Sequence, residues 1–260
     1  MTISSRCTNT NGTFRYNYKI KSSPEMDLTK TTTTSYMFGD CTSLETISGN
    51  LSLDSATTTD NMFINCINLR DVSGIKISNK STTGANMFKS CTCIEHPPQS
   101  IDFSGMTTTQ AMFSMCSSLK DAPQTINTSK ATNVSGMFEQ CANLEIGPNV
   151  IDCSSATNVA SLFNGCKKLR NLPDTLDFSK VSASANINNF VNNCYSIENL
   201  PSHFTAPTGN FTFTIPLQTL HGITNIQSVL DFFRNINDLS TKTAYTRTIS
   251  LSKYIKSRFT

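Results

Sequence analysis

One pattern recurs at a fixed step through most of this chain. Two adjacent apolar residues, usually Met-Phe, are followed by a cysteine, and an aliphatic residue stands three positions beyond that cysteine. The cysteines are Cys41, Cys66, Cys91, Cys116, Cys141, Cys166 and Cys194, so successive copies lie 25 residues apart five times and 28 residues apart once. A unit of this size cannot bury its own apolar face, so neighbouring copies must stack and turn each repeated position into a ladder. The repeat therefore predicts a solenoid.

Within each copy the residue pattern changes along the unit. Asn133 is a capping residue type at the start of 132–141, where apolar residues recur at the three-and-four spacing of a short helical turn. The segment from Leu169 to Leu172 indicates a brief strand that Pro173 ends, because proline offers no donor to a strand ladder. A second extended piece follows the proline, at 101–104, 151–154 and 176–179. The predicted fold class is an α/β repeat, a solenoid of about seven 25-residue coils with short parallel strands and short helical turns.

Charge alternates along the axis of this predicted solenoid. The residue after each ladder aliphatic is charged in every copy, and its sign changes at each step: Glu45, Arg70, Glu95, Lys120, Glu145, Arg170 and Glu198. Neighbouring strands lie ~4.8 Å apart, and opposite charges at that spacing stabilise a pair by roughly 0.2–1 kcal/mol. We expect an exposed salt-bridge ladder, which serves either to control register on a solvated face or as a charged recognition strip. The adjoining candidates for partner contact are Thr46, Asp71, His96, Asp121, Asn171 and Asn199.

The two ends of the chain depart from the repeat. An open stack exposes its first and last coils, so capping segments are expected there. We assign residues 1–34 to an N-terminal cap, in which Phe14, Tyr16 and Tyr18 alternate like a strand, and residues 35–203 to the repeats. Residues 204–260 are expected to form a C-terminal cap of strand, helix and strand, through which other subunits could attach.

No motif for catalysis, cofactor binding or metal binding stands out. The ladder cysteines are expected to be buried free thiols that act as small core residues. Cys91-x-Cys93-x-x-His96 offers three candidate ligands, but it has the wrong spacing for zinc and no second half, so no metal and no cofactor are predicted. Asp102, Asp152 and Asp177 recur at one position, which favours turn or cap acceptors over a catalytic carboxylate pair. The chain is therefore predicted not to be an enzyme.

Composition excludes two classes of partner. Charged residues make up 15% of the chain and the formal net charge is +3, with no basic stripe, which argues against nucleic acid as a partner. No apolar run approaches the ~18 residues of a membrane span, so no membrane insertion is expected. The first residues show no charged start followed by an apolar core, so the chain as given is predicted to carry no secretory signal.

The repeated Met-Phe-x-x-Cys-x-x-Leu, its trailing proline and stretches such as Ala131-Thr132-Asn133-Val134-Ser135-Gly136 resemble the BspA-like leucine-rich repeat family over about residues 35–201. The resemblance implies a leucine-rich-repeat-like solenoid and, in bacterial surface members, an adhesin. It therefore implies a non-catalytic module that contacts protein or glycan on a host or cell surface, with an extracellular surface or a virion as its place. The alternative is a structural spacer or decoration protein of a larger assembly such as a phage virion.

Overall fold

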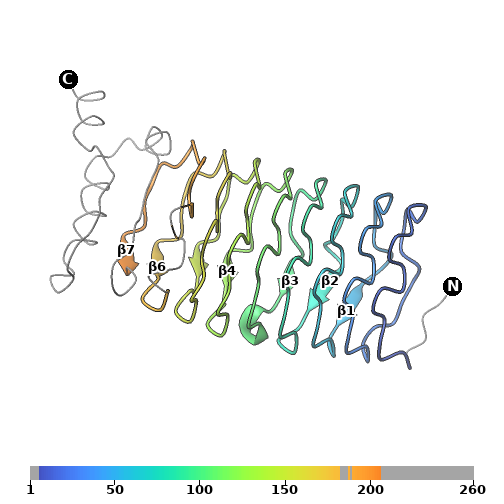
Figure 1. Ribbon diagram of the computed structural model, residues 1–260. Coiled ribbons are helices and arrows are strands. Elements are labelled where there is room, and N and C mark those ends of the chain that lie inside the picture. Colours follow the sequence, from blue (N-terminus) through green and yellow to red (C-terminus); the bar gives the residue numbers. More distant parts are fainter. Residues whose placement is uncertain (1–5, 182–186, 188, 206–260) are drawn as a thin grey trace, which may run out of the picture.

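The described part of the protein is an elongated stack of coils (Figure 1). The computed structural model describes residues 6–181, 187 and 189–205. The predicted C-terminal strand, helix and strand lie outside the described residues, apart from the first positions of that segment. Within the described ranges, no helix is long and apolar enough to cross a membrane.

Short parallel strands run along one side of the stack. They are β1 (Leu51–Leu53), β2 (Ile75–Ile77), β3 (Ser100–Ile101), β4 (Thr125–Ile126), β5 (Val150–Ile151), β6 (Thr175–Asp177) and β7 (His203–Thr205), with one 3-10 helix, η1 (Phe103–Gly105). They form three parallel sheets, β1-β2-β3, β4-β5 and β6-β7. Two further lines of single bridges join the coils, one through the threonines near Thr33 and one through residues such as Thr46 and Asp71. The predicted repeat solenoid with short parallel strands is therefore confirmed.

The core consists of ladders of identical side chains, as the period requires. The rings of successive coils stack with their planes within 5° of parallel and their centroids 5.4–5.7 Å apart, in Phe38, Phe63, Phe88, Phe113, Phe138 and Phe163. All six are fully buried, as are the methionines and leucines beside them. Phe190 instead meets Phe163 edge-on at 6.3 Å, where the repeat step lengthens. Offset stacking and edge contact are both favoured geometries for aromatic rings.

The ladder cysteines are buried free thiols, as predicted, and each also makes a hydrogen bond. The thiol of Cys66 donates to the carbonyl of Phe38 in the preceding coil at 3.0 Å, and Cys116 donates to Phe88 at the same distance. The same bond recurs at Cys41, Cys91, Cys141, Cys166 and Cys194. Cysteine suits this position because it is a small apolar side chain that still carries a donor.

The segments predicted as helical turns are chains of tight turns. In the coil at 86–91, the N–H groups of Lys89 and Cys91 bond within the coil, three residues back, whereas those of Phe88 and Ser90 bond to the next coil. An α-helix needs bonds four residues back and negative φ throughout. Here Asn86 and Ser90 have φ of 54° and 62°. The helical prediction for 132–141 is wrong for the same reason, since Gly136 and Gln140 have positive φ.

Two local predictions can be compared directly with the coils. Asp102, Asp152 and Asp177 accept the backbone N–H two residues on, which confirms them as turn acceptors. Phe14, Tyr16 and Tyr18 do not form a strand but lie in turns, because Phe14 occupies the phenylalanine ladder and stacks on Phe38 at 5.0 Å. The stack thus includes one more coil toward the N-terminus than the ladder cysteines indicate.

Candidate binding surface

The alternating charges lie in one line along a face of the stack, which we call the charged file. Backbone bonds link most successive members: for example, the N–H of Arg70 donates to Glu45 at 3.0 Å, and that of Glu145 to Lys120 at 2.9 Å. The N–H of Glu45 in turn donates to the carbonyl of Lys21, so the file begins one coil earlier than expected. Its members are exposed or half-exposed: Lys21, Glu45, Arg70, Glu95, Lys120, Glu145, Arg170 and Glu198. The predicted exposure and adjacency of the charges are confirmed.

The charged file does not form an unbroken chain of ion pairs. Lys120 Nζ lies 2.5 Å from Glu95 Oε2, and Lys21 lies 3.6 Å from Glu45. Glu145 pairs instead with Lys168, which stands outside the file. The Lys120 ammonium, through its hydrogen bond and its charge, lowers the pKa of Glu95. The expectation of a ladder over the full length is therefore wrong, because these long exposed side chains gain little from holding one geometry.

A second line of side chains, next to the charged file, contains the other predicted contact residues. His96 Nδ1 lies 2.8 Å from Asp121 Oδ2, and Asn199 donates to Asn171 at 2.9 Å. Thr46 donates to Ser22, one coil earlier. Asp71 instead turns back on its own coil: the hydroxyl and the N–H of Ser73 both bond its carboxylate and lower its pKa. The structure thus joins two pairs of the predicted residues by side-chain bonds, His96 with Asp121 and Asn171 with Asn199, whereas Thr46 and Asp71 bond other side chains.

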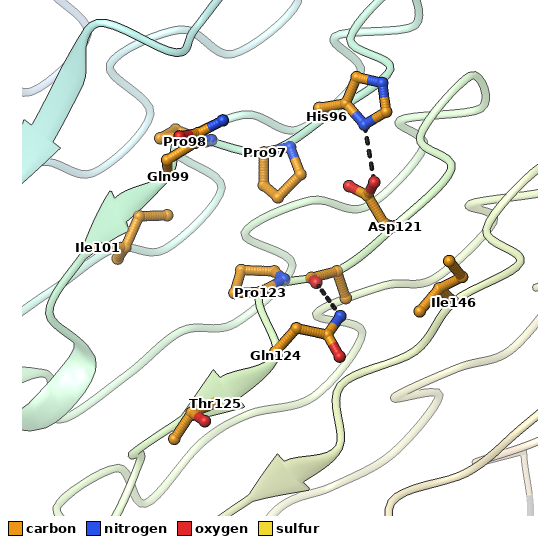
Figure 2. A pocket seen from close by; sticks show the side chains of 11 residues that line it. His96, Pro97, Pro98, Gln99, Ile101, Asp121, Pro123, Gln124, Thr125 and Ile146 are labelled. Carbon is orange, nitrogen blue, oxygen red and sulfur yellow. Dashed lines mark hydrogen bonds and ion pairs between the residues drawn. The ribbon is translucent and has the colours of Figure 1, made fainter.

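The central coils are hollowed where the chain bends from this face toward the strands. The hollow measures about 640 Å³ and is bordered by His96, Asp121, the prolines of two successive bends, β3 and β4 (Figure 2). At the inward position of the bend, the hollow is lined by the small side chain of Ala122. Other coils hold Val72, Leu172 and Leu200 there, all buried. A smaller hollow of about 350 Å³ adjoins it beside Arg70 and Asp71.

One coil departs from the repeat at two outward positions: Ile146, which lines the hollow, and Val150, which neighbours the lining residue Thr125. Ile146 lies at the position that is Thr, Asp, His or Asn in the other copies, and it is 57% exposed. Val150 pairs in register with Thr125, at a position that is otherwise polar, and it is 52% exposed. Ile146 lies on the far side of Pro123 from Ile101 (Figure 2). Sequence reasoning missed both residues, although their breaking of a polar column was a visible signal.

The hollow combines polar groups with apolar side chains. Figure 2 shows His96 held by Asp121, while the hydroxyl of Thr125 lies across the prolines from that pair. Cys91 is buried with its thiol on Phe63, Cys93 is half-buried and His96 is exposed, so the three candidate ligands do not converge. In the described ranges, no group of three His, Cys, Asp or Glu side chains is placed to hold a metal.

Comparison with known proteins gives a family. The family described as "Mycoplasma protein of unknown function, DUF285" matches residues 4–100 and 82–204, which include every copy that carries the BspA-like pattern. A leucine-rich repeat protein from Bacteroides ovatus ATCC 8483 is 18% identical with a TM-score of 0.37, over 70% of this chain and 56% of that one. A leucine rich cell surface protein from Faecalibacterium prausnitzii A2-165 is 14% identical with a TM-score of 0.28, over 98% and 80%. Curated protein sequences gave no significant match.

Proposed function

This chain belongs to the family described as "Mycoplasma protein of unknown function, DUF285". Because membership of this family assigns no function, we propose a function from the surface of the chain itself. The chain is a non-catalytic recognition module that binds a protein on another surface through the central hollow. The observation that carries this proposal is the coil with Ile146 and Val150. In a repeat protein, the fold explains a residue that recurs, whereas it does not explain an exposed aliphatic residue in a polar column.

The surroundings of these two residues suit a protein partner. Interfaces centre on a few apolar side chains that become fully buried, within a polar rim that excludes water. Ile146, Ile101 and the bend prolines supply the apolar part, and His96 with Asp121 supplies part of the rim. The charged file runs past the hollow as Glu95, Lys120 and Glu145. Its alternating signs favour a partner surface whose charges alternate in the opposite order and carry no large net charge.

Restoring the polar residues of the other coils tests the proposal. The double variant Ile146→Thr/Val150→Thr is expected to weaken binding of the labelled chain to cultured animal cells at least tenfold, since apolar anchors dominate interface energies. Both side chains are more than half exposed, so the melting temperature should stay unchanged. Binding isotherms on intact cells and on cells treated with protease measure the effect, and protease treatment should abolish it.

A matched control comes from the same molecule. Ile67 is also an exposed aliphatic residue, 40% accessible, but unlike Ile146 it lies outside the lining of the hollow, and unlike Val150 it is not paired with a lining residue in the strands. Ile67→Thr should bind as the unaltered chain does. Equal losses for Ile67→Thr and the double variant, or full binding by the double variant, would show that the hollow is not the contact surface.

The contribution of the charged file is tested separately by Lys120→Glu. This change removes the ion pair with Glu95 and places three acidic side chains in succession, at 95, 120 and 145. We expect slower association that depends on ionic strength, with little change in dissociation, because charges at an interface rim mainly steer the encounter. Surface plasmon resonance on immobilised cell-membrane protein, at low and high salt, measures both rates. A change confined to the dissociation rate would contradict the placement of Lys120 at the rim of the interface.

A further inference from the structure

A second unusual surface lies on the turn edge of the first described coils, away from the hollow. Each coil from Phe14 to Phe163 carries two left-handed positions there, one two residues before and one two residues after the ladder phenylalanine. Most copies fill them with glycine or with small or flexible polar residues such as Asn61, Asn86 and Ser90, which suit that conformation. Tyr36 and Tyr16 occupy these positions with φ of 56° and 62°. Bulky aromatic residues are outliers in this region.

Burial does not compensate for the strain at Tyr16. Its side chain is 53% exposed, and the neighbouring Tyr18 is 58% exposed, with its ring centroid 6.4 Å away and its plane tilted by 50°. Strained residues persist where the surrounding structure fixes them, and they cluster at ligand sites. Two exposed rings held at an angle, one of them in a costly conformation, therefore point to a binding surface.

A fixed set of polar groups lies beside these rings. The guanidinium of Arg15 stands 4.0 Å from the centre of the Tyr36 ring and 4.6 Å from that of Tyr16. Its Nε lies 3.3 Å from a carboxylate oxygen of Asp40. The other oxygen of Asp40 accepts from the Asn65 amide at 2.8 Å. Planar donors and acceptors are thus held next to exposed aromatic faces, with the charge of Arg15 balanced by Asp40.

We propose that this surface, formed by Arg15, Tyr16, Tyr18, Asp40 and Asn65, binds a neutral glycan. The apolar C–H face of a pyranose ring would lie on the tyrosine rings, while its hydroxyls bond the remaining donors and acceptors of Arg15, Asp40 and Asn65. An anionic sugar is disfavoured because Asp40 already balances Arg15. A protein partner is disfavoured because the edge continues from the rings as Asp40, Asn65 and Ser90, which gives it few apolar anchors. The proposal does not depend on the hollow.

Strain and binding give the experiment two readouts that move in opposite directions. Tyr16→Asn replaces an outlier with a residue that tolerates the left-handed region, so the melting temperature should rise by roughly 2–4 °C. The same change removes a ring, so binding to an array of neutral glucose-, galactose- and N-acetylhexosamine-terminated oligosaccharides should fall at least tenfold. Tyr18→Ser should lower binding in the same way without the rise in melting temperature, because Tyr18 does not have a positive φ.

Met115→Asn is the matched control, because Met115 occupies the same left-handed position in a central coil with φ of 63°. It should raise the melting temperature and leave glycan binding unchanged. The Ile146→Thr/Val150→Thr chain should also keep its glycan binding, which separates this surface from the hollow. No binding to any neutral glycan, binding only to sialylated ones, or equal binding by Tyr16→Asn would overturn the proposal.

Discussion

Raising the pH above about 9 is expected to unfold this protein within roughly one pH unit. Eight buried cysteines carry thiols whose pKa is raised by burial, which disfavours the thiolate. For Cys116 the pKa reaches about 12. In the unfolded chain a cysteine titrates near ~8.5. Between those values the unfolded state releases protons that the folded state retains, so stability is complete below about 8.5 and falls as pH rises.

The size of the effect follows from the number of thiols. Each group costs at most about 1.4 kcal/mol of stability per pH unit in this window, so eight cost on the order of 11 kcal/mol per unit. A protein of ordinary stability has about 5–15 kcal/mol to lose. Circular dichroism and thiolate absorbance, followed together under reducing conditions, should change in one steep transition before lysine and tyrosine titrate.

Variants within the cysteine ladder show whether the thiols cause this transition. Cys91→Ala/Cys116→Ala removes two of the eight groups, so the loss of stability per pH unit should fall by about a quarter. At neutral pH the same variant should be less stable, because each change deletes a hydrogen bond to a phenylalanine carbonyl. A native chain whose buried thiols react with a thiol reagent as fast as the half-buried Cys7 and Cys93 would refute the explanation.

Phe113→Ala is expected to destabilise the chain by about 3–5 kcal/mol, the usual cost of emptying a large buried aromatic site. Phe113 is fully buried, and its ring stacks on Phe88 at 5.4 Å and on Phe138 at 5.7 Å. Each coil of a solenoid contacts only its neighbours, so a defect in the middle weakens coupling between the two halves. Urea denaturation should show a lower midpoint and a broader or divided transition.

Phe14→Ala provides the comparison at the end of the ladder. Phe14 is only partly buried, and within the phenylalanine ladder it stacks on Phe38 alone. Phe14→Ala should lower the free energy of unfolding by about half as much as Phe113→Ala, and the unfolding transition should stay single. If both variants lost the same stability, the ladder would not be acting as a chain of nearest-neighbour contacts.

The ladders were predictable from the sequence because the period alone decides them. Residues 25 apart must stack, so the buried positions of Phe113 and Cys116 and the line of charges from Glu45 follow without knowledge of backbone conformation. The first coil could not be recognised in the same way, since Asn17 stands where the other copies have cysteine. Its place is shown by the stacking of Phe14 on Phe38.

The turn edge was not predictable from hydrophobic spacing. Apolar residues such as Val134, Met137 and Cys141 have the spacing of a helix, yet every second N–H in that segment bonds the next coil. Spacing reports which side chains face inward and not where backbone donors point. Gly136 was a local sign, since glycine suits the left-handed position that the turns require. The two surfaces were missed because a search for shared positions overlooks residues such as Ile146 and Tyr16, which depart from them.

The stacked phenylalanines also determine how such a molecule can change its length. Each junction between Phe38 and Phe163 repeats one contact, ring on ring and thiol on carbonyl. A whole coil can therefore be gained or lost between Phe63 and Phe138 without creating a new kind of junction. The surface around Tyr16 and the hollow lie on different coils of the stack. Each added or deleted coil would therefore shift their separation by ~4.8 Å, the spacing of neighbouring strands. The number of coils would then set the distance between partners bound at the two proposed surfaces.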